Sequence, residues 1–179
     1  MHGGDSEISN EEAHAILEPY FIVARRLFTE YCEGIGLGDA VKSTKFECRP
    51  EIHDSERHYA ATTLDGRKVL VAPELAELPE DTVAAIFAHE FGHVLDHLYP
   101  ACFVCVEDEL VFLGEVPEGE HSDQTRLARM KQWEGRDDHI VEVTADQIAE
   151  QVTGSRIGYS GPCMLQGLNR GVRRPKHVT

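Results

Sequence analysis

The residues best suited to do chemistry lie in the segment HEFGH, which contains His89, Glu90 and His93. If this segment is helical, His89 and His93 lie one turn apart on one face, about 6 Å along the axis, and their imidazoles can converge on one zinc ion. Glu90 leaves the helix beside His89, where a carboxylate can take a proton from a zinc-bound water. The H-E-x-x-H pattern therefore predicts a zinc site with its own general base.

Another histidine, His97, continues the spacing of His89 and His93. On a helix it would lie about 12 Å beyond His89 along the axis, which is too far for the same ion. We therefore expect His97 to face solvent or to bond a neighbouring group, and not to be the third ligand.

A third protein ligand must come from elsewhere in the chain. The metzincin pattern would need glycine at position 96 and histidine at position 99, where this chain has Asp96 and Tyr99. The later segment EVTAD offers Glu142 as a ligand. One turn further on, Asp146 can accept the outer N–H of a ligand histidine. The competing candidates are His121 and the acids of residues 107–123, together with Asp137, Asp138 and His139.

Helices are expected to carry both segments. A capping box formed by Ser9 and Glu12 predicts a first helix over residues 10–33. A second helix, which carries HEFGH, is expected to begin near Pro79 with acids in its first turn and to run to about Tyr99.

The segment EVTAD is expected to lie on a third helix, residues 137–154, which Gly154 closes. Ala145 is small and would let this helix approach the HEFGH helix closely. Between the two helices, residues 107–123 are acidic and irregular and look like an excursion from the main fold. A short helix is expected over residues 122–133.

Strands are expected before the HEFGH helix. Residues 45–49 favour a short strand, and residues 58–73 favour two strands joined at Asp65 and Gly66, a composition typical of hairpins. The predicted fold class is therefore α+β, with a small, largely antiparallel three-stranded sheet packed against the N-terminal helix, the HEFGH helix and the EVTAD helix.

Charge is distributed unevenly along the 179 residues, whose formal net charge is −15. All 32 acidic residues precede residue 151, whereas the remainder carries five basic residues and no acidic one. An acidic body repels phosphate backbones, so we expect no binding to nucleic acid. The basic end is expected to be solvated or to contact an acidic surface.

Other features indicate a soluble protein. No apolar stretch is long enough to span a bilayer, and the polar N-terminus resembles no secretory signal, so we expect a cytoplasmic location and no membrane partner. Five irregularly spaced cysteines argue against a disulfide framework. Cys102 and Cys105 have C-x-x-C spacing without a second pair. We expect buried thiols there, with a redox or metal role as the alternative.

HEFGH followed by EVTAD resembles the gluzincin zinc metallopeptidases, including the minimal catalytic domains of the ImmA/IrrE-type regulators. The resemblance covers roughly residues 10–155 and depends on about ten specific positions. It implies a zincin-like domain over residues 1–155, followed by a basic tail rich in glycine and proline, residues 156–179. It also implies peptide-bond hydrolysis, with a zinc cofactor held by His89, His93 and Glu142 and with Glu90 as general base.

Several expectations remain open at this stage. Tyr159, His139 and Tyr99 are candidates for stabilising the oxyanion, and we favour Tyr159. The partner would be a protein or peptide, which an edge strand within residues 57–72 could hold by strand addition. The alternative function is a catalytically silent zinc-binding domain that acts as a protein-interaction module. The sequence contains no signal for the oligomeric state.

Overall fold

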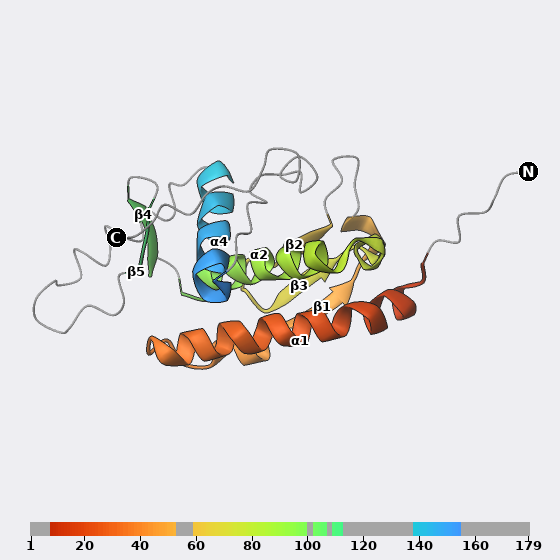
Figure 1. The fold of residues 1–179 in the computed structure, drawn as a ribbon, viewed down its shortest axis with the longest axis horizontal. Helices are drawn as coiled ribbons and strands as arrows, with labels where there is room; N and C mark the ends of the chain where they lie inside the picture. Colours follow the sequence, from red (N-terminus) through yellow and green to blue (C-terminus); the bar gives the residue numbers. More distant parts are fainter. Residues whose placement is uncertain (1–7, 53–58, 100–101, 107–108, 113–137, 155–179) are drawn as a thin grey trace, which may run out of the picture.

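The computed structural model describes residues 8–52, 59–99, 102–106, 109–112 and 138–154. Its helices and strands are α1 (Asn10–Gly34), β1 (Lys45–Cys48), β2 (Ala60–Thr62), β3 (Lys68–Val71), α2 (Glu80–Leu98), β4 (Phe103–Val106), β5 (Glu109–Phe112) and α4 (Asp138–Thr153). Figure 1 shows α1 along one side of α2, the sheet near one end of α2, and α4 crossing its other half. The predicted α+β class is confirmed.

Helix α1 begins as the sequence predicts. The Ser9 hydroxyl accepts the backbone N–H of Glu12 at 3.2 Å, and the Glu12 carboxylate accepts the backbone N–H of Ser9 at 3.1 Å. This capping box satisfies two donors that the helix start leaves without partners. The helix continues through Pro19 and buries one face, which includes Leu17, Phe21 and Phe28.

The three-stranded sheet has the order β1-β3-β2 and is mixed. β2 pairs antiparallel with β3, as the hairpin pattern predicts, but β1 pairs parallel with β3. The prediction of a largely antiparallel sheet is therefore wrong. Alternating apolar residues mark where a strand lies but not which strand lies beside it, and β1 has paired with β3 instead of with its neighbour in the chain, β2.

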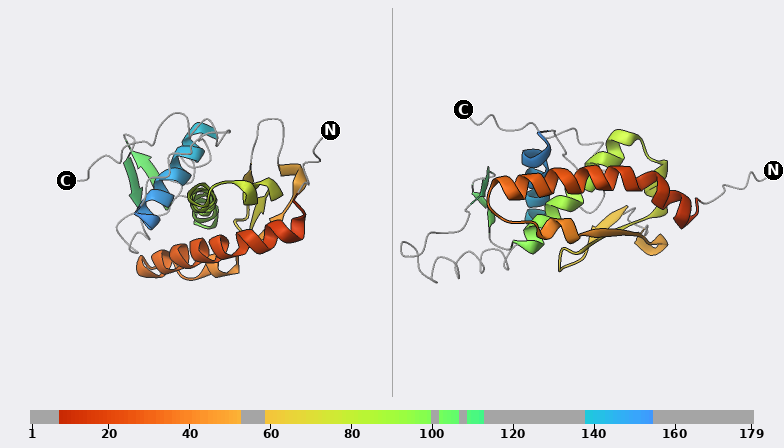
Figure 2. Two further views of the ribbon diagram at one scale, coloured as in Figure 1. Left: turned by 45° about the vertical axis from the view of Figure 1, so that its right-hand side comes forward. Right: turned by 90° about the horizontal axis from the view of Figure 1, so that it is seen from below.

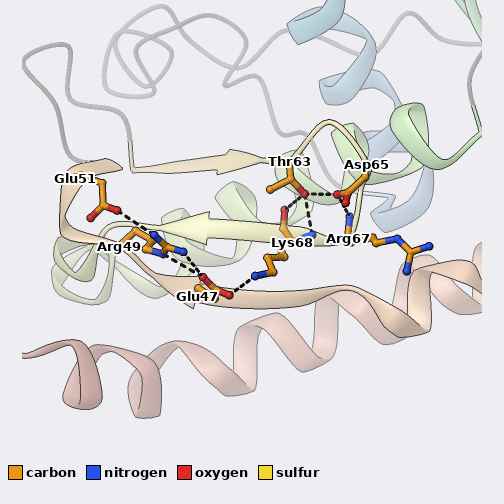
Figure 3. Close-up of polar contacts among 7 residues, drawn as sticks. All are labelled: Glu47, Arg49, Glu51, Thr63, Asp65, Arg67 and Lys68. Carbon is orange, nitrogen blue, oxygen red and sulfur yellow. Dashed lines mark hydrogen bonds and ion pairs between the residues drawn. The ribbon is translucent and has the colours of Figure 1, made fainter.

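The turn between β2 and β3 is stabilised by its own polar groups. The Asp65 carboxylate accepts the Thr63 hydroxyl at 2.6 Å and the backbone N–H of Arg67 at 3.0 Å, and Gly66 adopts a positive φ of 66°. Figure 3 shows these contacts beside the exposed ion pairs that Glu47 forms with Lys68 and Arg49. Because these pairs are exposed, they contribute little to stability.

Helix α2 is buried along most of its length, which explains its largely apolar sequence. Figure 2, in its left view along α2, shows α1, α4 and the sheet arranged around this helix. Phe87 and Phe91 of α2 contact Phe21 of α1, with ring centroids 5.9 and 5.4 Å apart. Aromatic contacts of this kind bury large apolar surfaces, so α2 is the centre of the core.

Helix α4 matches the third predicted helix, and Gly154 follows it with a positive φ of 68°. It crosses α2 where both helices have small residues. A Cβ atom added to Gly92 would overlap the carbonyl oxygen of Ala145 and lie 2.8 Å from its carbonyl carbon. The expected close approach at Ala145 is therefore confirmed, and Gly92 is the residue that permits it from the other side.

Strands β4 and β5 form a separate antiparallel pair, in which Phe103 pairs with Phe112 and Val106 with Glu109. The prediction that the region after residue 106 is irregular is thus wrong for residues 109–112. The acidic pair at 107–108 separates two short apolar runs, and the high charge around it obscured their alternation. The predicted helix over 122–133 and the tail over 156–179 lie outside the described residues.

Within the described parts of the chain, each helix is either too short or too polar to cross a lipid bilayer.

Replacing Gly92 with alanine is expected to destabilise the protein by about 1–3 kcal/mol, because the methyl group overlaps backbone atoms of α4. Chemical denaturation measures the change. The matched control is Gly34→Ala at the end of α1, where an added Cβ has no neighbour within 4 Å. We expect that change to stay within roughly 0.5 kcal/mol. Equal losses in the two variants would contradict the close crossing.

Candidate metal centre

His89 and His93 lie one turn apart on α2, and both are buried, with 1% and 7% of their surfaces exposed. Their rings meet edge to face, and the two Nε2 atoms are 3.1 Å apart. Such close approach of two ring nitrogens inside a protein requires further polar partners, because a buried nitrogen without one is costly. The predicted convergence of the two imidazoles is therefore present.

Glu142 reaches the same point from α4. Its Oε2 lies 2.9 Å from Nε2 of His89, and its Oε1 lies 3.3 Å from Nε2 of His93. About a quarter of the Glu142 side chain is exposed, so solvent reaches this member of the group. The ligand atoms of His89, His93 and Glu142 all lie within 4.8 Å of one another, and the group could hold a metal ion.

Asp146 supports His89 from behind. Its Oδ1 lies 2.7 Å from Nδ1 of His89, and both side chains are buried. A carboxylate accepts hydrogen bonds, so Nδ1 of His89 carries a proton and donates a hydrogen bond to Asp146. This fixes the orientation of the ring and directs Nε2 toward His93 and Glu142. The contact is the one that the sequence predicts for an outer N–H of a ligand histidine.

The charges within the group indicate why a cation fits it. Burial alone would lower the pKa of His89, but its hydrogen bonds to Asp146 and Glu142 outweigh burial and raise that pKa well above its ordinary value. Burial would likewise raise the pKa of Glu142, yet the hydrogen bonds of His89 and His93 bring it well below its usual range. In the metal-free protein a proton on His89 therefore offsets the carboxylates.

The same donors suit a metal ion. With Nδ1 of His89 protonated, Nε2 of the neutral ring has a lone pair that faces the Glu142 carboxylate. Nε2 of His89 and Oε2 of Glu142 are then both acceptors, and at a separation of 2.9 Å they need either a proton or a cation between them. Two imidazoles and one carboxylate are donors that zinc prefers, and three protein ligands are typical of catalytic zinc sites.

Glu90 lies beside this group but does not belong to it. It is 3% exposed, and its Oε2 accepts a hydrogen bond from the Thr62 hydroxyl at 2.7 Å. The same hydroxyl lies 3.1 Å from the backbone carbonyl oxygen of Glu90. The sequence does not indicate a role for Thr62, because a threonine in a hairpin strand is ordinary and Glu90 is 28 positions away.

His97 lies outside the group, as its spacing predicts. Its Nδ1 is 3.0 Å from the backbone carbonyl oxygen of Leu64, in the turn between β2 and β3. His97 therefore joins the end of α2 to the hairpin.

The remaining candidates of the sequence analysis are not brought into the group. Tyr99 lies near Cys32, which is close to the end of α1. Burial and this thiol raise the pKa of Tyr99. Cys102 is half-buried. The other candidates lie outside the described residues or side chains: Tyr159, His121, Asp137, and the side chains of Asp138, His139 and Cys105.

Comparison of the whole chain with protein-family models, with curated proteins and with solved structures finds no match.

Removing Glu142 or Asp146 is expected to weaken zinc binding to different extents. Glu142→Ala removes a ligand and should reduce the affinity severely, whereas Asp146→Ala removes the partner of Nδ1 and should reduce it about 10–100-fold. Asp138→Ala, one turn before Glu142 on the same helix, serves as the control and should leave the affinity nearly unchanged. Titration against a competing chelator measures all three. A larger loss for Asp138→Ala than for Glu142→Ala would refute the assignment of the third ligand.

Zinc affinity is also expected to fall on acidification. The pKa of His89 in the metal-free protein is raised, so a proton occupies Nε2 at and below neutral pH and must leave before zinc binds. The affinity should therefore rise as the pH rises, and zinc should be lost roughly below pH 5–6. Chelator competition at several pH values tests this, and an affinity that is the same at pH 5 and pH 8 would contradict it.

Proposed function

We propose that this protein is a zinc-dependent metallopeptidase of the gluzincin type, which hydrolyses peptide bonds in a protein or peptide substrate. The observation that carries the proposal is the convergence of His89, His93 and Glu142, with Glu90 next to His89 on α2. Asp146 adds the outer hydrogen bond that such a site needs.

Three residues would hold the metal: His89 and His93 through Nε2, and Glu142 through its carboxylate. A bound zinc ion would supply a Lewis acid that polarises a scissile carbonyl and lowers the pKa of a water toward about 7. Asp146 would keep His89 in the tautomer that leaves Nε2 free for the metal. The donor types favour zinc over calcium or magnesium, which prefer oxygen ligands alone.

Glu90 would act as the general base. It follows His89 in the chain, so its carboxylate leaves α2 beside the ligand group. One oxygen of the carboxylate would accept the proton of the attacking water and later pass it to the leaving amine. The position of Glu90 relative to His89 and His93 is inherent in the pattern, since α2 carries all three residues.

The sheet offers a means of holding a substrate. β2 is at the edge of the described three-stranded sheet, and its last residue, Thr62, contacts Glu90. An edge strand presents backbone groups that an extended peptide can pair with. A peptide bound in this way would run beside α2, which is consistent with a zincin-like arrangement of helices and edge strand.

A catalytically silent zinc-binding domain is the second candidate. The observation that favours it is the burial of Glu90, since a carboxylate that is 3% exposed and bonded to Thr62 also fits a structural role. In that case the domain would bind zinc and a partner protein without cleaving it. The two candidates differ in hydrolysis, so one substitution separates them.

Replacing Glu90 with glutamine is expected to keep the fold and the zinc but to reduce hydrolysis by about 10²–10⁴-fold, because an amide cannot accept the proton. Zinc content by elemental analysis and cleavage of a proteome-derived peptide library measure the two properties. Glu18→Gln on the exposed face of α1 is the matched control and should cleave as the wild type does. Turnover of Glu90→Gln within a few-fold of the wild type would refute the role of Glu90. Zinc binding by the wild type without any cleavage would favour the silent domain.

A further inference from the structure

The hydroxyl of Thr62 contacts Glu90 at two atoms. It lies 2.7 Å from Oε2 of the carboxylate and 3.1 Å from the backbone carbonyl oxygen. Thr62 is the last residue of β2, where it pairs with Val69 of β3, and its side chain is half-buried. The sheet therefore fixes the position of the hydroxyl, and the hydroxyl fixes one oxygen of the carboxylate.

A general base needs this kind of support. The glutamate side chain has three rotatable bonds, and a displacement of about 1 Å at a reacting group can cost roughly 100-fold in rate. A hydroxyl carries a single proton, which it donates to the nearer acceptor, Oε2. Oε1 is not part of that hydrogen bond and can serve in proton transfer.

We infer that Thr62 is a positioning residue for Glu90, because its hydroxyl holds Oε2 and orients Oε1 for proton transfer. The inference rests on the proposed function, since it assigns Thr62 a part in the same reaction. The inference also assigns a second function to the edge strand β2. The strand that can pair with a substrate determines where the base lies.

Thr63 provides an internal comparison. Its hydroxyl also donates to a carboxylate, Oδ1 of Asp65, at 2.6 Å, but this pair is exposed and closes the hairpin turn. Figure 3 shows Thr63 and Asp65 at that turn. The two neighbouring threonines thus make the same type of bond for different purposes, and Thr63→Val controls for any general effect of losing a hydroxyl from the hairpin.

The first test compares Thr62→Val, Thr62→Ser and Thr63→Val as zinc-loaded proteins on the peptide library and on one peptide selected from it. Valine keeps the shape and strand preference of threonine but has no hydroxyl, so Thr62→Val should fold. We expect its kcat to fall about 10–100-fold, with KM and zinc affinity within a few-fold of the wild type. Thr62→Ser restores the hydroxyl and should recover most of the lost kcat, and Thr63→Val should retain the wild-type kcat. A wild-type kcat in Thr62→Val, or no recovery in Thr62→Ser, would overturn the inference.

The second test needs neither metal nor activity. Thermal unfolding is measured in chelator for Thr62→Val, Glu90→Ala and the double variant. If the hydroxyl holds the carboxylate, the shifts of the single variants should depart from additivity by roughly 2 °C or more. Additive shifts would overturn the inference, whatever the peptidase assay shows. A wild-type protein that binds zinc but cleaves no peptide would instead refute the proposed function, even with coupled shifts, so the two failures are distinguishable.

Discussion

Where α2 crosses α4, the backbone of Gly92 lies against the carbonyl group of Ala145, and no room remains for a side chain between them. This contact determines how far Glu142, three residues before Ala145 on α4, and Asp146, the residue after it, must reach to His89. A carboxylate bound to a buried ring at 2.7–2.9 Å leaves little freedom for the helix spacing to vary. The geometry of the polar group therefore depends on an apolar contact between two small residues.

Because the group of His89, Glu142 and Asp146 is largely buried, its ionised side chains need partners within the protein. Asp146 is 3% exposed and His89 is 1% exposed, and ionised groups removed from water in this way are costly unless they are paired. Here the partners lie on two helices and are more than 50 positions apart in the chain. Neither helix alone satisfies its polar side chains. Their association is thus favoured by hydrogen bonding as well as by the surrounding core of aromatic residues.

The features that the sequence predicted are those encoded by short-range spacing. HEFGH and EVTAD each place side chains by helical periodicity, and the capping box at Ser9 and the hairpin around Gly66 are local as well. Contacts between α2 and α4 were also expected, because both motifs belong to one pattern, but strand pairing and the contact of the sheet with α2 were predicted wrongly or not at all. The parallel pairing of β1 with β3, the β4–β5 pair and the contact of Thr62 with Glu90 belong to this class. Nothing in the residues near Thr62 indicates which helix its hydroxyl will meet.

Strand β2 and the turn after it are attached to α2 at two places, at Glu90 through Thr62 and at His97 through the carbonyl group of Leu64. On the hairpin, the two attachments are at Thr62 and Leu64, two residues apart. The strand can therefore neither slide along the helix nor pivot against it. A chain paired with the outer edge of β2 in the described sheet could then shift only in steps of two residues, about 6.6–6.8 Å, if its side chains are to keep the same faces. The register of that pairing, rather than a pocket for one particular side chain, would decide which peptide group stands opposite Glu90.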